Sequence, residues 1–314
     1  MKPPVRGDMQ LMSATPQNDT TKTPTASRVA IVTGASAGIG RRICERLAGK
    51  DICVVAVARS AAPLKELAQS LESKGTVCLP VIADVSDPND LEHLVSEVMN
   101  RFGRIDILVN NAGVDCFSNF SQLATEQILQ TIETNLTGAI LLTRLVVPVM
   151  ISRKSGAIIN MASTAGKHGP AFGAVYGATK AGLIAFTQGL RGELLKQGIS
   201  ASVICPGFCR NGGIYDRIIA GTGRRTSLFV GGTTADDVAS AVISAIESGC
   251  PEKIVNWPPM KPVFLFRDLF PRLGEKLILM VTRKFLQRAA SLSDASGAEP
   301  PHKTVNEALE SRPS

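Results

Sequence analysis

The sequence of 314 residues contains only 3 histidines, and its 7 cysteines form no metal-binding pattern. No C-x-x-C pair occurs, and no cysteine has a histidine partner at the spacing of metal ligands. The usual zinc-site patterns are therefore excluded, and we predict no metal site. The neighbours of the cysteines are mostly apolar, so we expect reduced thiols in the core of a protein from a reducing compartment.

Signals for export and membrane insertion are also missing from the sequence. No stretch approaches the 18 or more apolar residues of a spanning helix, and the N-terminal residues lack the apolar segment of a signal peptide. Residues 1–27 are rich in Pro, Thr, Ser, Gln and Asn, which predicts a disordered arm. A transit peptide is disfavoured by Asp8, Asp19 and the scarcity of arginine. We predict a cytoplasmic location.

The positive charge is local, which argues against a nucleic-acid-binding protein. The chain has a net charge of +7, and residues 258–290 alone hold seven Lys or Arg against two Asp or Glu, which gives +5. Residues 28–257 carry only a small excess of positive charge, whereas a protein that follows a phosphate backbone is expected to be basic over its body.

The composition and the order of apolar segments predict an α/β protein. Hydrophobic residues make up 44% of the chain and aromatic residues 4%, as is typical of a buried parallel sheet rich in Ala, Val, Ile and Leu. Apolar strands alternate with helical patterns, which predicts a Rossmann-type doubly wound parallel sheet in a single domain. Strands are expected at residues 29–33, 52–57, 77–82, 105–109, 157–161, 200–205 and 253–256. The predicted divisions are an arm (1–27), a catalytic domain (28–257), an amphipathic extension (258–290) and a disordered tail (291–314).

A glycine-rich turn follows the first predicted strand. The segment Gly34-Ala-Ser-Ala-Gly38-Ile-Gly40 lies between that strand and a helical pattern. A strand, a glycine turn and a helix in this order allow the backbone to approach a pyrophosphate, which the helix N-terminus then binds. We predict a dinucleotide site here, with Gly34, Ser36, Gly38, Ile39 and Gly40 as its candidate residues.

The second strand ends in Ala58-Arg59-Ser60 without an acidic residue. Because an acidic residue at this place suits the ribose of NAD and an arginine suits the extra phosphate of NADP, we predict NADP(H) as the cofactor and Arg59 as its phosphate ligand. The alternative is that Arg59 is a solvated loop residue. Asp84, after the third strand, is predicted either to bind the adenine amino group or to cap the turn before the next helix.

Tyr176 and Lys180 are four residues apart at the start of a predicted helix, so their side chains share one face. Since a free phenol has a pKa near 10, a tyrosine that exchanges a proton near neutral pH needs a cation beside it. Lys180 can supply this cation, and Ser163 can bind a substrate oxygen nearby. By itself the Tyr-x-x-x-Lys spacing is weak evidence for catalysis, because it occurs on many helices as a half-exposed tyrosine beside a solvated lysine. His168, between Ser163 and Tyr176, is expected to be a substrate-loop residue.

Asn135 lies in a predicted helix from residue 125 to 151 among Ile132, Leu136 and Ile140. Such an asparagine must find hydrogen-bond partners, either in a buried network or as a purely structural contact. After the fourth strand, Asn110-Asn111-Ala112-Gly113 offers small residues that would let the cofactor lie across the edge of the sheet, so Asn111, Ala112 and Gly113 are predicted to contact it.

The motifs together resemble the short-chain dehydrogenase/reductase family over residues 28–257. The resemblance implies that Tyr176 exchanges the proton, Lys180 lowers the phenol pKa and holds the nicotinamide ribose, Ser163 binds the substrate oxygen and Asn135 anchors a water. It also implies a homodimer or homotetramer through the helices with Asn135 and Tyr176. One departure is Asn211, where the family often has a threonine. The motifs are Thr33-Gly34-x-x-x-Gly38-Ile39-Gly40, Asn110-Asn111-Ala112-Gly113, Asn135, Ser163, Tyr176-x-x-x-Lys180 and Pro206-Gly207.

Two segments are expected to vary with the substrate. By resemblance, residues 208–232 form a glycine-rich flap, in which Arg224 and Arg225 are expected to face solvent rather than an anionic substrate. Residues 258–290 form a basic amphipathic helix broken at Pro271. The alternatives for this extension are contact with an anionic membrane through residues 260–290, or packing on its own domain or a partner subunit.

These features predict an NADP-dependent oxidoreductase that acts on a lipophilic ketone, 3-oxoacyl thioester or steroid-like alcohol. One alternative is a redox-sensing module that binds NADP without turnover, and another is a peripheral membrane scaffold.

Overall fold

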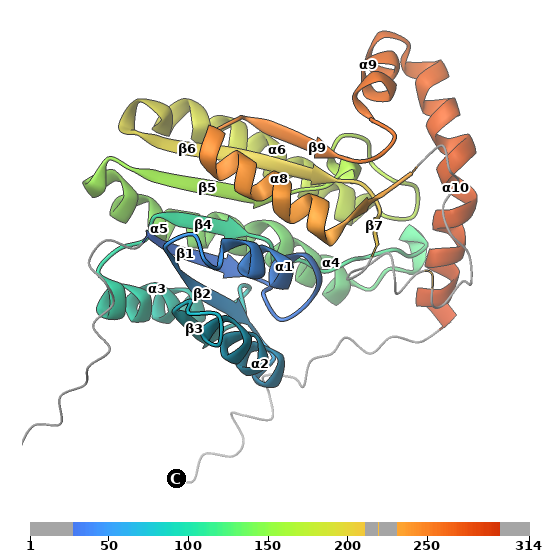
Figure 1. The fold of residues 1–314 in the computed structure, drawn as a ribbon. Coiled ribbons are helices and arrows are strands. Elements are labelled where there is room, and N and C mark those ends of the chain that lie inside the picture. The colour runs from blue at the N-terminus through green and yellow to red at the C-terminus, as the bar shows by residue number, and fades with distance from the viewer. Residues whose placement is uncertain (1–27, 211–218, 220–230, 296–314) are drawn as a thin grey trace, which may run out of the picture.

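A computed structural model describes residues 28–210, 219 and 231–295 (Figure 1). The predicted arm, the segment beyond residue 295 and most of the predicted flap, with Asn211, Arg224 and Arg225, lie outside the described residues.

The core is a seven-stranded parallel sheet with the order β3-β2-β1-β4-β5-β6-β9. This confirms the predicted α/β fold with its doubly wound sheet. Every residue of β2 is buried, because helices cover both faces of the sheet. The strands are β1 (Arg28–Thr33), β2 (Ile52–Ala58), β3 (Cys78–Ile82), β4 (Ile107–Asn110), β5 (Gly156–Met161), β6 (Ile199–Pro206) and β9 (Glu252–Val255).

Two helical layers enclose the sheet (Figure 1). Helices α1, α2 and α8 pack on the face that holds Ala30 and Val32, and α3, α5 and α6 pack on the face that holds Val29 and Ile31. Alternate residues of each strand thus enter different cores. The helices are α1 (Gly38–Leu47), α2 (Ala61–Glu72), α3 (Pro88–Phe102), α4 (Thr125–Ile132), α5 (Gly138–Arg153), α6 (Ala174–Leu194), α8 (Ala235–Ser248), α9 (Lys261–Leu269) and α10 (Pro271–Ala295).

Helix α3 shows why some boundaries follow directly from the sequence. Asp87 accepts a hydrogen bond from the backbone N of Asn89 at 2.8 Å, Pro88 occupies the first turn, and Gly103 ends the helix with φ of 67°. A capping acid, an N-terminal proline and a left-handed glycine define both ends.

The predicted helix over residues 125–151 contains an irregular turn. A π-helical turn, Glu133–Thr137, separates α4 from α5 and holds Asn135. At the start of α5, Gly138 lies so close to the loop after β3 that an added Cβ would be 2.2 Å from the Val85 carbonyl oxygen. A π-helical turn contains one more residue than an α-helical turn, and in this turn Asn135 is buried where the helix meets the loop after β3.

The combined helix Thr125–Arg153 also corrects the expectation that no segment suits a membrane. It has a window of mean hydropathy 1.6, long and apolar enough to cross a bilayer by length and composition. However, Leu142, Val146 and Met150 are fully buried against the sheet, so the helix belongs to the core of the protein.

The C-terminal region differs from the prediction in length and in its connections. Helix α10 reaches Ala295, beyond the predicted end of the extension at residue 290. Two unpredicted short strands, β7 (Cys209–Arg210) and β8 (Thr233–Thr234), pair in parallel and join the two ends of the predicted flap segment. Backbone hydrogen bonds between Gly232 and Trp257 then connect β8 to the chain that enters α9.

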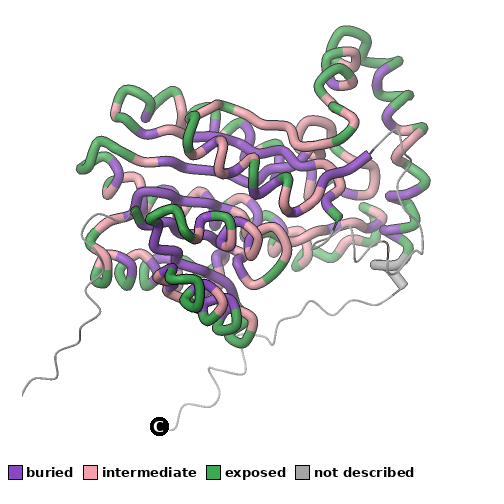
Figure 2. The backbone as a smooth tube through the Cα atoms, in the orientation of Figure 1, coloured by how far each residue is buried: buried purple, intermediate pink, exposed green. Residues whose placement is uncertain are grey.

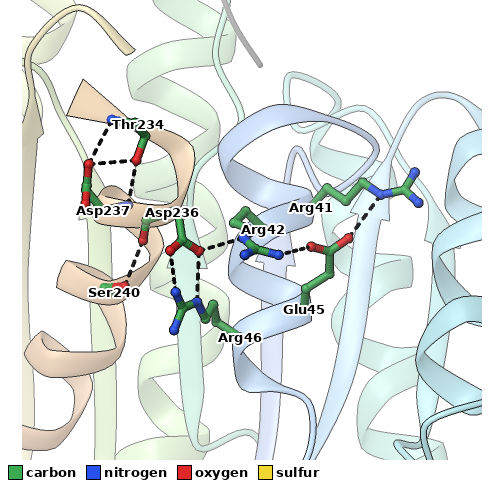
Figure 3. Close-up of polar contacts among 8 residues, drawn as sticks. All are labelled: Arg41, Arg42, Glu45, Arg46, Thr234, Asp236, Asp237 and Ser240. Carbon is green, nitrogen blue, oxygen red and sulfur yellow. Dashed lines mark hydrogen bonds and ion pairs between the residues drawn. The ribbon is translucent and has the colours of Figure 1, made fainter. Parts of the chain in front are cut away.

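Ion pairs connect α1 to α8 on the surface (Figure 3). Asp236 accepts hydrogen bonds from Arg46 and, at 2.7 Å, from Arg42, which also contacts Glu45 at 2.9 Å. The hydrogen bonds from Arg46 and Arg42 lower the pKa of Asp236. Because such exposed pairs stabilise little, the buried contacts between the helices and the sheet remain the main source of stability.

The close contact at Gly138 leads to a stability prediction. Gly138→Ala is expected to lower the free energy of unfolding by about 1–3 kcal/mol, because the added Cβ collides with the Val85 carbonyl. Gly189→Ala is the control: this exposed glycine of α6 has no atom within 4 Å of its added Cβ, so alanine should be neutral or stabilising. Urea unfolding checks both, and equal stability of the two variants would contradict the prediction.

Candidate active site

A cavity of about 700 Å³ lies at the carboxyl edge of the sheet. It collects the residues that follow β1, β2, β4, β5 and β6, because parallel strands end at the same edge. Two predicted site residues, Gly38 and Asn135, are not part of its wall. The predicted residues in the wall are Gly34, Ser36, Ile39, Gly40, Arg59, Asp84, Asn111, Ala112, Gly113, Ser163, Tyr176, Lys180, Pro206 and Gly207.

The glycine turn after β1 needs its glycines for two physical reasons. Gly34 and Gly38 have φ of 67° and 54°, a conformation that residues with a Cβ rarely adopt. At Gly40 an added Cβ would lie 2.1 Å from the Gly34 carbonyl oxygen, so only glycine lets α1 begin this close to the turn. Gly38 therefore shapes the site without lining it.

The N-terminus of α1 suits an anionic group. Its N-cap is Ala37, which makes no side-chain hydrogen bond, and no acidic residue occupies the first turn. By contrast, Asp87 and Thr234 cap α3 and α8. A helix end without a capping side chain, next to a glycine turn and a cavity, fits the pyrophosphate of a dinucleotide.

Thr33, which the sequence prediction did not include among the site residues, holds two turns of the wall together. Its hydroxyl accepts hydrogen bonds from the backbone N of Asn111 and of Ala112, both at 3.0 Å. The Asn111 side chain donates to the Thr33 carbonyl at 2.9 Å. Asn111 thus supports the glycine turn through its side chain. The sequence could have indicated a role for Thr33, because Thr33 is the first residue of the quoted family motif.

Arg59 and Asp84 lie together on the cavity wall. The Arg59 guanidinium is 3.6 Å from the Asp84 carboxylate, and the Arg59 side chain is 42% exposed. The carboxylate also accepts hydrogen bonds from the backbone N of Ser86 at 2.9 Å and from its hydroxyl at 2.6 Å. Of the two predicted roles for Asp84, the structure contains the turn cap. The exposed guanidinium is available to an anionic ligand.

Asn135 is 1% exposed and joins three segments. It accepts a hydrogen bond from the Val114 backbone N at 2.7 Å, and its amide donates to the Val114 carbonyl at 2.9 Å and the Thr179 hydroxyl at 3.3 Å. Asn135 also lies behind the wall next to Lys180, since a Cβ added at Gly113 would be within 3.4 Å of both side chains. Of the two predicted alternatives, the structure contains the buried network.

Ser163, Tyr176 and Lys180 form the polar part of the cavity. Ser163 lies close enough to the Tyr176 hydroxyl to influence its pKa, and the Lys180 ammonium donates to the Met161 carbonyl at 2.9 Å. The Lys180 nitrogen is 5.7 Å from the centre of the Tyr176 ring. Both side chains therefore face the same space, as the spacing of four predicts.

Burial changes the acidity of both groups. Desolvation raises the pKa of Tyr176 to about 12, although Ser163 opposes this, and desolvation lowers the pKa of Lys180 to about 8. Desolvation of the hydroxyl is the largest influence on the phenol pKa, and the expectation that Lys180 lowers this pKa stays a prediction. A lysine with a pKa near 8 can carry or release a proton close to neutral pH.

The α9–α10 hairpin, formed by residues 261–295, contributes a wall that the sequence prediction missed. Phe264, Ile278, Thr282 and Leu286 line the cavity together with Met260. His168 also lines the cavity. Burial is the main cause that lowers the pKa of His168, and the positive charge of the nearby Arg267 lowers it further. The apolar stripe of the extension was visible in the sequence, but which neighbour it covers was not.

Comparisons with known proteins agree on a family. A family model described as short chain dehydrogenase matches residues 28–214. A ketoacyl reductase, HetN, from Nostoc is 37% identical over 238 residues, which cover 76% of this chain and 82% of that protein. A 3-oxoacyl-[acyl-carrier-protein] reductase, FabG, from Salmonella typhimurium is 36% identical over 58% of this chain and 73% of its own.

Solved structures with the same fold contain a cofactor. A variant of the actinorhodin polyketide ketoreductase with NADPH has a TM-score of 0.69 and 31% identity, covering 75% of this chain and 97% of that chain. A metagenomic short-chain oxidoreductase with NADP has a TM-score of 0.63 and 31% identity, covering 74% and 98%. About a quarter of the present chain thus has no counterpart in either structure.

The low pKa of Lys180 leads to a pH prediction. Between pH 8 and 10.5 the folded protein has lost the Lys180 proton while the unfolded chain still holds it, so stability rises with pH across this window. The free energy of unfolding of the wild type, minus that of Lys180→Met, should increase by about 2–3 kcal/mol from pH 7 to 10. Urea unfolding at several pH values measures this difference, and a constant difference would contradict the assigned pKa.

Proposed function

This chain belongs to the short-chain dehydrogenase family, and on that premise we propose that it is an NADP-dependent oxidoreductase that interconverts a carbonyl group and an alcohol. We assign this activity to residues 28–257. The observation that carries the proposal is a single cavity whose wall contains the glycine turn, Ser163, Tyr176 and Lys180. A nucleotide-binding turn and a proton-donating group on one cavity are what hydride transfer to a carbonyl requires.

The chain's own residues would bind the substrate oxygen and move a proton to it. NADPH, when bound, supplies the hydride to the carbonyl carbon. Ser163 donates a hydrogen bond to the carbonyl oxygen, and Tyr176 transfers its proton to the same oxygen. Protonated Lys180 stabilises the resulting phenolate and holds the nicotinamide ribose. Asn135 keeps the Val114 turn in place behind Lys180 and anchors a water that returns the proton.

Arg59 supports NADPH over NADH. It is exposed at the end of β2, and Asp84, the acid within reach, is already engaged by Arg59 and Ser86. The guanidinium would bind the 2′-phosphate, with Ser36 and Ser60 nearby on the wall. Gly34, Ile39, Gly40, Ala112, Gly113, Pro206 and Gly207 would contact the remainder of the cofactor, while Gly38 and Asn111 support the turn.

The proposed substrate is lipophilic. Phe117, Phe208, Phe264, Ile278 and Leu286 give the cavity an apolar wall beside its polar groups. Since similar proteins are named as ketoacyl and 3-oxoacyl reductases, a 3-oxoacyl thioester or a related ketone is the substrate class we propose.

The predicted homodimer or homotetramer has support from exposed apolar side chains on the helices concerned. Leu129, Ile132 and Ile151 of the Thr125–Arg153 helix are 51%, 36% and 37% exposed. Such residues suit a subunit contact. The cytoplasmic location stays a prediction. Contact of the extension with a membrane is a separate question, which depends on the exposed residues on the outer face of α9 and α10.

Tyr176→Phe tests the catalytic proposal. We expect NADPH affinity to be retained and the turnover number to fall about 10²- to 10⁴-fold, because the variant lacks only the proton donor. Cofactor titration followed by NADPH oxidation across a panel of lipophilic ketones and 3-oxoacyl thioesters measures both quantities. Unchanged turnover would refute the role of Tyr176, and a wild type that binds NADPH without turning over any of the panel would favour the redox-sensing module.

Arg59→Ala tests the cofactor proposal. Loss of a charge-assisted phosphate contact should weaken NADPH binding about 10- to 100-fold and leave NADH binding nearly unchanged. Arg101→Ala, an exposed arginine on α3 away from the cavity wall, is the matched control and should alter neither affinity. Equal weakening of NADPH and NADH binding by Arg59→Ala would contradict the phosphate role.

A further inference from the structure

The α9–α10 hairpin presents apolar side chains on two opposite sides. Its inner side packs on the catalytic domain: Phe264, Ile278, Phe285 and Leu286 are at most 8% exposed. Phe285 meets Phe208 edge to face, with ring centres 5.4 Å apart. This contact confirms the predicted alternative in which the extension packs on its own domain.

The outer side of the same hairpin is also apolar, but it is open to solvent. Of the thirteen exposed large hydrophobic residues in the described part of the chain, six lie between residues 265 and 280. Figure 2 shows exposed backbone along much of α9 and the first turns of α10. The six residues, with their exposed fractions, are Leu265 (61%), Leu269 (65%), Phe270 (55%), Leu273 (58%), Leu277 (44%) and Met280 (68%).

Helical spacing gathers these residues into one surface. Leu273, Leu277 and Met280 follow the i, i+4, i+7 pattern of a single stripe, and Ile278 and Leu286 point to the opposite side of α10. Leu265 and Leu269 are likewise one turn apart on α9. The outer stripe is therefore not needed for packing on the catalytic domain.

A close contact holds the two helices together, so the outer surface has a defined shape. A Cβ added at Gly274 of α10 would lie 2.4 Å from the Cα of Arg267 on α9. Arg267 also donates a hydrogen bond to the Lys167 carbonyl of the catalytic domain. These contacts hold α9 against α10 and connect α9 to the catalytic domain.

The charge around this surface identifies its partner. Lys261, Arg272, Lys276, Arg283 and Lys284 are exposed on the hairpin, and residues 258–290 have a charge of +5. A second copy of the chain would bring equal positive charge against it, whereas an anionic bilayer offers both negative headgroups and an apolar interior.

We propose that the outer face of the α9–α10 hairpin docks on an anionic lipid bilayer. The six exposed apolar side chains enter the boundary between headgroups and acyl chains, and the surrounding Lys and Arg side chains contact the lipid phosphates.

The test uses the full chain and sedimentation with lipid vesicles. Vesicles of equal parts phosphatidylglycerol and phosphatidylcholine should bind the protein, and vesicles of phosphatidylcholine alone should bind it much more weakly. Absence of binding to the anionic vesicles, or equal binding to both kinds, would overturn the proposal.

Variants of apolar residues distinguish vesicle binding through the hairpin from nonspecific binding through other exposed apolar side chains. The triple variant Leu273→Ser, Leu277→Ser, Met280→Ser should lose at least tenfold in vesicle affinity, because it removes the α10 stripe. A control double variant, Ile82→Ser with Leu195→Ser, removes two comparably exposed residues outside the hairpin and should bind as the wild type does. Equal loss in both variants, or no loss in the first, would refute the role of the hairpin.

Charge variants and the oligomeric mass complete the test. Lys276→Gln with Lys284→Gln should weaken binding about 25-fold, at about fivefold for each basic residue, and Lys65→Gln with Lys196→Gln should have little effect. Circular dichroism of every variant establishes that it is folded. If light scattering shows that the hairpin triple variant lowers the oligomeric mass while vesicles never bind, the surface is a subunit interface and the membrane proposal fails.

Discussion

The close approach of α1 to the turn that precedes it determines the shape of the cavity. Gly40 lies against the Gly34 carbonyl, and Thr33 binds the turn after β4 through its hydroxyl and its carbonyl. These contacts join the two turns that flank the centre of the sheet. The residues at the start of α1 consequently line the cavity together with its polar side chains.

Burial has opposite effects on the two titratable groups of the site. The phenol of Tyr176 becomes a weaker acid and the ammonium of Lys180 a stronger one, because the charged form of each is poorly solvated. The sequence spacing placed both groups on one helix face, but the depth of the cavity depends on residues distant in the chain. Their protonation could therefore not be read from the spacing.

The sequence predicted the parallel sheet and most of the site because these depend on local patterns. Continuous apolar runs located the strands, and Asp87, Pro88 and Gly103 defined α3. The π-helical turn at Asn135 was missed, since one extra residue leaves the apolar pattern of a helix almost unchanged. The positions of Gly38 and Asn135 outside the cavity wall, and of Ile278 and Leu286 in it, depend on tertiary packing. An apolar stripe indicates burial but does not name the neighbour that covers it.

The α9–α10 hairpin follows β9, the last strand of the sheet in the chain. The order of the strands therefore does not depend on the length or the sequence of the hairpin. Ser163, Tyr176 and Lys180, by contrast, come from the turn after β5 and from α6, which lie within the layers of the fold. The hairpin part of the apolar wall and the polar side chains of the cavity are thus encoded in separate stretches of the gene. Mutation can remodel this part of the wall during evolution while the polar side chains of the cavity keep their positions.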